Sequence, residues 1–98
     1  MKVRFLVPAE QELIEAAAFY EQQVPLLGRN FLDIIETAVR EIREHPGRWP
    51  EVEKGIRRRV VRRFPYSLLY TIKEDELVIL AVMHHKQKPR YWIGRVEL

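Results

Sequence analysis

The alternation of hydrophobic and polar residues divides this chain into a strand, two helices and a run of further strands. Residues 3–7, VRFLV, are apolar and β-prone, which is typical of a strand. Pro8 suits the first turn of a helix, and apolar residues then repeat at helical spacing, so residues 9–23 are predicted to be helical. Pro25 and Gly28 bracket a short break after this helix.

A second helix is predicted from a set of apolar residues spaced three and four apart, which places them on one face. The members of that face are Phe31, Ile34, Ile35, Ala38, Val39 and Ile42. The sequence His45-Pro46-Gly47 ends this helix. Because few residues join the two helices, we expect them to form an antiparallel hairpin.

The C-terminal half is predicted to be mostly β-structure. Residues 47–55 form a loop, and strands are expected at about residues 56–64, 66–73 and 77–84. The last strand is apolar on both faces, as expected of a central strand.

The tail, residues 86–98, is predicted to hold one short helical turn near residues 89–95. The element order β-α-α-β-β-β predicts a single α+β domain over residues 1–98, with the helical hairpin packed on one face of an antiparallel sheet.

Composition narrows the class of protein. Ninety-eight residues, 47% of them hydrophobic, suit one small domain with a modest core. No apolar run reaches the roughly 18 residues that span a bilayer, and the start of the chain lacks the layout of a signal peptide. The chain has no cysteine, which excludes a disulfide framework and a thiolate zinc site. We therefore expect a cytoplasmic protein.

The charge is divided unevenly along the chain. Residues 1–53 carry six Lys/Arg and ten Asp/Glu, a balance of −4, whereas residues 54–98 carry eleven and four, a balance of +7. Such asymmetry indicates a polyanion or an acidic protein as the partner.

Five arginines fall within the first strand of the C-terminal half, namely Arg57, Arg58, Arg59, Arg62 and Arg63. If the strand continues through all of them, Arg57, Arg59 and Arg63 line one face. Arg58 and Arg62 then line the other face, and both faces cannot bury unpaired guanidinium groups. Two interpretations follow, a charged edge strand that resists edge-to-edge pairing and a basic binding surface, and the charge asymmetry favours the second.

Two histidines, His84 and His85, end the last strand and are followed by Lys86, Lys88 and Arg90. Adjacent strand residues point to opposite faces, so the histidines make a poor shared metal site, and no metal is expected. One histidine could transfer protons near neutral pH, but the spacing favours the simpler reading that both merely end the strand.

The aromatic residues allow similar alternatives. Tyr91 could stack on a nucleic-acid base or cap the core, Trp92 is predicted to be core, and Trp49 is predicted to fold a loop onto the sheet. The helix acids are predicted to lie mostly on outward faces, some of them paired with arginines. They are Glu10, Glu12, Glu15, Glu21, Glu36, Glu41 and Glu44.

Three segments together resemble one known family. FLDIIETAVREIREHPGRWP, RRRVVRRFPYSLLYTI and LVILAVMHHKQKPRYW, in that order, are similar to the RelE/ParE superfamily of toxins from bacterial type II toxin–antitoxin systems. The motifs FPYSLLY and AVMHHKQKPRYW lie nearest the ParE and plasmid-stabilisation branch. The family fold, two helices on a small antiparallel sheet, agrees with the element order predicted above.

The resemblance implies a growth-inhibiting toxin that a cognate antitoxin neutralises through a disordered, acidic C-terminal segment. ParE-like members inhibit DNA gyrase, and RelE-like members cut mRNA in the ribosome. Neither branch implies a cofactor. At the positions where RelE-like enzymes place two arginines and a tyrosine, this chain has Ser67, His85 and Tyr91.

Tyr91 matches the family tyrosine and His85 could still transfer protons, so the expected function depends chiefly on Ser67. Ser67 cannot supply cationic stabilisation of a phosphate, so we expect a ParE-like gyrase inhibitor that is not an enzyme. The alternatives are an mRNA endonuclease, in which Arg59, Arg62 and Arg63 hold phosphate while His85 and Tyr91 act in acid–base roles, and a non-toxic basic interaction module. The residues expected to bind phosphate, antitoxin or target are Arg57, Arg58, Arg59, Arg62, Arg63, Lys86, Lys88 and Arg90.

Overall fold

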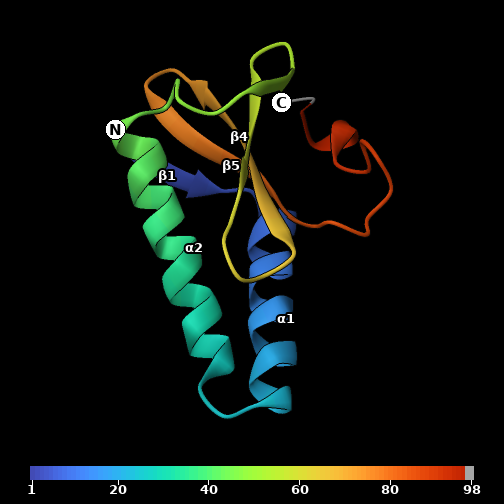
Figure 1. The fold of residues 1–98 in the computed structure, drawn as a ribbon. Coiled ribbons are helices and arrows are strands. Elements are labelled where there is room, and N and C mark those ends of the chain that lie inside the picture. The colour runs from blue at the N-terminus through green and yellow to red at the C-terminus, as the bar shows by residue number, and fades with distance from the viewer. Residues whose placement is uncertain (97–98) are drawn as a thin grey trace.

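The computed structural model describes residues 1–96 and contains two long helices and one five-stranded sheet (Figure 1). The elements in chain order are β1 (Lys2–Phe5), α1 (Val7–Gln23), α2 (Leu27–Glu44), β2 (Glu51–Glu53), β3 (Ile56–Val60), β4 (Tyr66–Lys73), β5 (Glu76–His84) and a short 3-10 helix, η1 (Ile93–Val96). The predicted fold class, α+β with a helical hairpin against a small sheet, is confirmed.

The sheet has the order β1-β5-β4-β3-β2, which places β5 and β4 at its centre. Strands β3, β4 and β5 pair in antiparallel fashion, as expected, and β2 pairs antiparallel to β3. Strand β1 runs parallel to β5, so the sheet is mixed. The chain returns to the sheet only after the whole helical hairpin, and such a long connection permits parallel pairing. Strand β2 lies inside the segment 47–55 that was predicted to be a loop.

Strand β3 ends at Val60, four residues earlier than predicted. Residues 62–65 form a bend in which Arg63 takes a left-handed conformation with φ of 71°. A non-glycine residue in this region interrupts a strand, and Pro65 has no N–H to donate to a ladder. The strand alternation predicted for the arginines therefore stops before Arg62.

The tip of the helical hairpin is closed by Gly28 and Glu21. A Cβ atom at Gly28 would lie 2.3 Å from the carbonyl oxygen of Ala17, so only glycine allows α1 and α2 to approach this closely. The Glu21 carboxylate accepts hydrogen bonds from the backbone N–H groups of Leu26 (2.9 Å) and Gly28 (3.1 Å). It thereby satisfies donors at the start of α2, so Glu21 is not the merely solvated residue that was expected.

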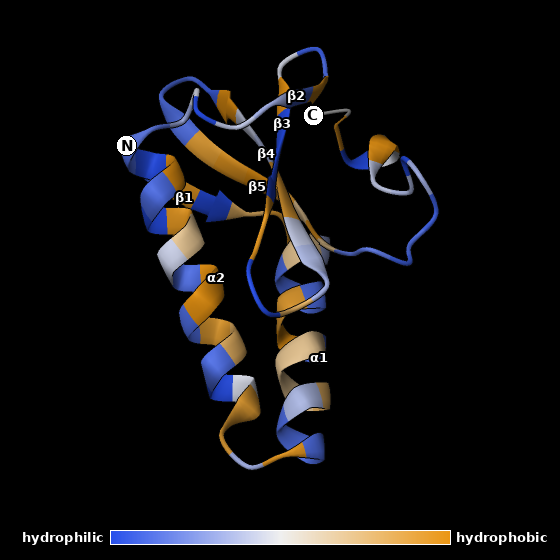
Figure 2. Ribbon diagram, viewed as in Figure 1, coloured by the Kyte–Doolittle hydropathy of each residue, from blue (hydrophilic) through white to orange (hydrophobic). Residues whose placement is uncertain are grey.

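The core lies between the helices and the sheet. Strand β5 is apolar along its length and β3 is polar, as the orange and blue strands of Figure 2 show. Tyr20 of α1 and Phe31 of α2 meet Phe64 and Tyr66 at ring-centroid distances of 4.8–6.3 Å. Trp92 is buried, which confirms its predicted place in the core. Among the described residues, no helix is long and apolar enough to span a membrane.

Candidate functional site

The arginines of β3 lie on both faces of the sheet, as the alternation predicted. Arg57 pairs with Tyr70 and Arg59 with Leu68, so both lie on the face that the helices cover, while Arg58 lies on the other face. Arg62 was expected to share a face with Arg58, and this prediction is wrong. Because the strand has already ended, Arg62 turns back to the helix side.

Arg57 ties down the loop that follows α2. Its guanidinium donates to the carbonyl oxygens of Trp49 (2.6 Å) and Gly47 (3.4 Å) and lies 3.6 Å from the Glu51 carboxylate. These contacts satisfy the guanidinium group of Arg57 within the fold. Arg57 therefore serves chiefly to hold the loop, and Trp49 packs against the core as predicted.

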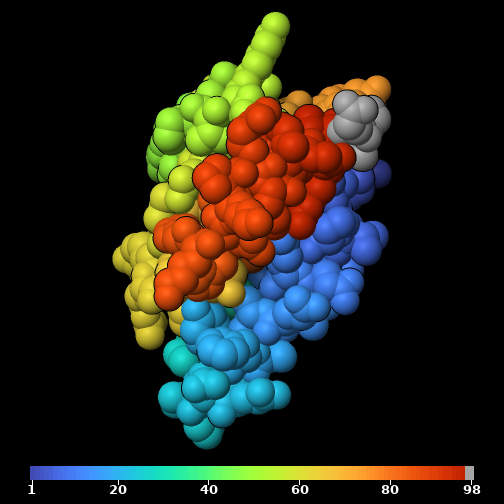
Figure 3. Space-filling model, turned by 90° about the vertical axis from the view of Figure 1, so that its right-hand side faces the viewer, coloured from blue at the N-terminus to red at the C-terminus, as the bar shows by residue number. Residues whose placement is uncertain are grey.

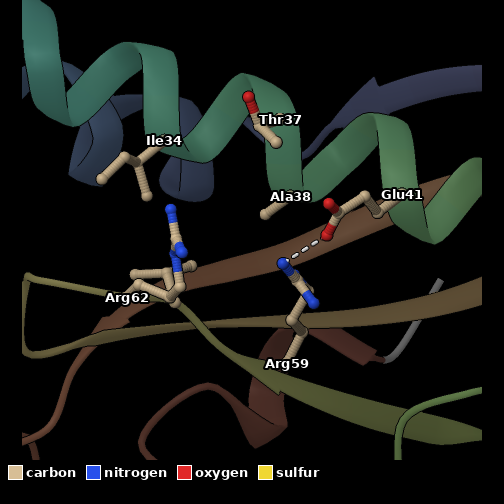
Figure 4. Close-up of a pocket in the computed structure, with 7 residues that line it drawn as sticks. Ile34, Thr37, Ala38, Glu41, Arg59 and Arg62 are labelled. Carbon is tan, nitrogen blue, oxygen red and sulfur yellow. Dashed lines mark hydrogen bonds and ion pairs between the residues drawn. The ribbon is translucent and has the colours of Figure 1, made fainter.

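Arg59 and Arg62 line a cleft of about 320 Å³ between α2 and β3, which we call the α2–β3 cleft. Its other lining residues are Ile34, Thr37, Ala38, Glu41 and Val61. Figure 4 shows both guanidinium groups rising toward α2, where Arg59 meets Glu41. The Arg59–Glu41 distance is 2.5 Å, and the guanidinium carbon of Arg59 lies 4.5 Å from the centroid of the Trp49 ring.

On the opposite face, Arg58, Ser67 and His85 form a short chain of hydrogen bonds. Arg58 Nε donates to Ser67 Oγ at 3.0 Å, and Ser67 Oγ lies 2.8 Å from His85 Nε2. Ser67 is fully buried, although it is polar. Burial, with the nearby Arg58 cation, lowers the pKa of His85 below its ordinary value, which favours the neutral imidazole.

The C-terminal tail, residues 85–96, is fastened to the start of α1 by Glu12. The Glu12 carboxylate accepts from the Tyr91 hydroxyl (2.7 Å), from Arg95 (2.9 and 3.0 Å) and from the backbone N–H of Val82 (3.0 Å). Arg95 also donates to the Leu80 carbonyl oxygen. Since β1 pairs with β5 only as far as Ile79, these side chains complete the part of the β5 edge that β1 leaves open.

Sequence reasoning missed this network, because Glu12 was grouped with the outward acids. A signal was available, since Glu12 is three or four residues from Ala9 and Ala16 on the buried face of α1. Figure 3 shows the tail lying against α1 on one side and against the region of β2 on the other.

Tyr91 is held within this network. Burial first, and then the hydrogen bond to the Glu12 carboxylate, raise the pKa of its phenol far above the ordinary range. His85 bonds to Ser67 and Tyr91 bonds to Glu12, and within residues 1–96 no hydrogen bond links His85 with Tyr91. The two residues proposed for acid–base chemistry thus belong to separate networks.

The remaining basic residues lie at the surface. Lys86 and Lys88 are exposed, and Arg63 is exposed in the bend after β3. Arg90 donates to Glu53 at 2.6 Å and so joins the tail to β2. Among residues 1–96, no group of three or more potential metal-binding side chains is gathered at one place.

Comparisons with known proteins concern the family and the fold of the chain. Residues 3–89 match the family model described as the ParE toxin of the type II toxin–antitoxin system parDE. The fold is similar to a solved structure titled as the chromosomal ParDE toxin–antitoxin system from P. aeruginosa, with a TM-score of 0.61 and 19% sequence identity. That alignment covers 86% of this chain and 95% of the other. No curated protein matches the sequence.

Proposed function

This chain belongs to the ParE family of toxins from type II toxin–antitoxin systems, and from that premise we propose that it stops cell growth by inhibiting DNA gyrase. A cognate antitoxin neutralises it. The observation that carries the proposal is the family match over residues 3–89, which includes both long helices, strands β2 to β5 and all of β1 except Lys2. The proposed place of action is the cytoplasm, where gyrase works, and the toxin needs no cofactor.

The hydrogen bonds of the would-be nuclease residues support a protein inhibitor over an enzyme. Ser67 stands where the family resemblance places an arginine in RelE-like toxins, and it is buried beneath Arg58. The Tyr91 hydroxyl donates a hydrogen bond to the Glu12 carboxylate, and the raised pKa of Tyr91 opposes loss of its proton. A general acid or base works best with a pKa near the operating pH, and Tyr91 is far from that condition.

The charge distribution supports an acidic antitoxin as the partner. Residues 54–98 carry a balance of +7, and Arg62, Arg63, Lys86 and Lys88 are exposed. An acidic segment that folds on binding would meet complementary charge here, which speeds association and selects the partner. In this proposal Arg57 and Arg90 act mainly within the fold, since both are already bonded to other residues.

One observation favours the second candidate, a ribosome-dependent mRNA endonuclease. Arg58 lies close enough to Ser67 to bring a guanidinium group beside His85. This cation could replace part of the charge that Ser67 lacks, with His85 as the proton carrier. The two candidates make opposite predictions about RNA.

Induction of the chain in bacteria, without any antitoxin, separates the two candidates. A gyrase inhibitor is expected to arrest growth and to leave ribosome-bound mRNA intact, and the variant His85→Ala is expected to remain toxic. Cleavage of ribosome-bound mRNA, together with loss of toxicity in a stably folded His85→Ala variant, would establish the nuclease instead. Harmless induction of a stable protein would leave only the non-toxic interaction module.

A further inference from the structure

The outer edge of β3 is open at Val60. Strand β2 pairs only with Ile56 and Arg57, and the last backbone bond on that edge runs from the N–H of Arg58 to the carbonyl oxygen of Pro50 (3.1 Å). Val61 N–H bonds to β4, so by alternation the N–H and C=O groups of Val60 point away from β4. The Val60 side chain is 55% exposed, which leaves this edge accessible to another chain.

The α2–β3 cleft carries cations whose bonding is incomplete. Within residues 1–96 Arg62 makes no ion pair, and its guanidinium faces the cleft beside that of Arg59 (Figure 4). Arg59 gives only one nitrogen to Glu41, and its buried Nε atom has no hydrogen-bond partner among the described residues. A guanidinium fork is best satisfied by two oxygens, such as those of a carboxylate.

We propose that the open edge of β3 and the α2–β3 cleft together form a docking site for an extended peptide segment that carries carboxylates. The segment adds as a short strand at Val60 and directs acidic side chains onto Arg59 and Arg62. This inference deepens the proposed function and rests on it in one respect, because the natural segment is taken to be the acidic part of the antitoxin.

Strand geometry explains why the edge and the cleft act together. A residue placed opposite Val60 shares its face, which is the face away from the helices, and its two neighbours point to the helix side. Those neighbours therefore reach the α2–β3 cleft, where Arg59 and Arg62 lie. Main-chain bonds supply affinity and the pocket selects side chains, as in other cases of strand addition.

Glu41 competes with a partner carboxylate for Arg59. Its carboxylate holds Arg59 in the free protein, and its side chain is 41% exposed, so it can turn toward water when a partner carboxylate arrives. If the Arg59–Glu41 pair served only to stabilise the fold, neutralising Glu41 would leave peptide binding unchanged or weaken it. In this account neutralising Glu41 removes a competitor and strengthens peptide binding.

A peptide probe tests the site directly by nuclear magnetic resonance. The probe is the blocked peptide acetyl-TVEVEVT-amide, and its control is acetyl-TVQVQVT-amide, which has the same shape without charge. The acidic peptide is expected to shift the Val60 amide and the Arg59 Nε–H resonances, and to bind at least about five-fold more tightly than the control. Shifts confined to other surfaces, or equal affinity for both peptides, would overturn the proposal.

Four variants separate the edge from the charge. Val60→Pro removes the outward N–H without touching the bonds to β4, and it is expected to abolish peptide binding, whereas Val60→Thr keeps that N–H and retains binding. Arg62→Gln is expected to weaken the acidic peptide about five-fold, and Arg43→Gln, an exposed arginine elsewhere on α2, is expected to have no effect. Binding that survives Val60→Pro in a folded protein contradicts strand addition.

The Glu41→Gln variant provides a result of opposite sign. It is expected to bind the acidic peptide about three-fold more tightly than the wild type, the scale of one partly exposed ion pair. Unchanged or weaker binding would contradict the competition. A short oligothymidylate serves as the last probe, and its displacement of the peptide from Val60 and Arg59 would point to a nucleic-acid site instead.

The outcomes distinguish this inference from the toxin assignment. The peptide measurements use the purified chain and do not depend on toxicity, so a harmless protein that binds the acidic peptide at Val60 keeps the docking site and loses the proposed function. A toxic protein that binds the peptide elsewhere, or not at all, keeps the function and loses the docking site.

Discussion

Glu12 and Arg95 form a part-buried ion pair that fastens the C-terminal tail, and replacing either residue is expected to loosen that tail. Both side chains are 19% exposed, and the carboxylate accepts four hydrogen bonds in all, three of them from the tail residues Tyr91 and Arg95. The change Glu12→Gln keeps one acceptor oxygen for the β5 backbone but removes the charge. The expected result is a lower free energy of unfolding.

The magnitude follows from the exposure of the pair. Breaking a fully buried pair costs about 3–5 kcal/mol, and an exposed pair contributes about 0–1 kcal/mol. With one-fifth of each side chain exposed, we expect Glu12→Gln and Arg95→Met each to cost about 2 kcal/mol, with a coupling energy of about 1.5 kcal/mol between them. In a domain of this size, a loss of about 2 kcal/mol lowers the melting temperature by about 8–16 °C.

The assay is a double-mutant cycle by urea unfolding, with the fluorescence of buried Trp92 as a probe of the tail. The matched control is the surface pair Arg4–Glu76, which has a similar distance of 3.1 Å but side chains that are 46% and 30% exposed. The control cycle should give a coupling energy below about 0.5 kcal/mol. An equally small coupling for Glu12 and Arg95 would refute the fastening of the tail.

Three further predictions concern single positions. The pKa of His85 should lie below 6.5 by NMR titration and should rise in Arg58→Gln. Because this pKa is depressed in the folded state, His85 contributes stability above pH 6.5 that is lost as the pH falls through the folded pKa. An unshifted pKa of His85 would contradict the Arg58–Ser67–His85 chain. Gly28→Ala should destabilise the protein by about 2 kcal/mol or more in thermal unfolding, since its Cβ meets a backbone oxygen at 2.3 Å, and a neutral result would mean that the helices are less closely packed. Tyr91→Phe should cost about 1 kcal/mol of stability yet leave growth inhibition intact, whereas loss of toxicity in a folded variant would favour a catalytic phenol.

Local patterns in the sequence predicted most of the fold. The spacing of Phe31, Ile35, Ala38 and Ile42 identified the buried face of α2, because a helix repeats every 3.6 residues whatever surrounds it. Alternation placed Arg57, Arg58 and Arg59 correctly, but it failed at Arg62. The failure came from the backbone, since the left-handed Arg63 ends the strand and no pattern of side chains marks that conformation.

Contacts between distant residues could not be predicted from local patterns. Glu12 meets Arg95 across 83 positions of the chain, and the parallel pairing of β1 with β5 joins residues 2–5 to residues 76–79. A charged residue on a helix is solvated in most cases, so Glu12 was assigned to the surface. Its true place follows from the open β5 edge, which becomes visible only when the sheet order is known.

The central claim, that this ParE-family protein inhibits gyrase, is tested most directly with purified components. The protein is added to DNA gyrase and relaxed plasmid, and both supercoiling and cleaved gyrase–DNA complexes are measured, with heat-unfolded protein as the control. The account predicts inhibited supercoiling or accumulated cleavage complexes with the folded protein alone. Gyrase that works unimpeded in the presence of a protein that still arrests growth would contradict it.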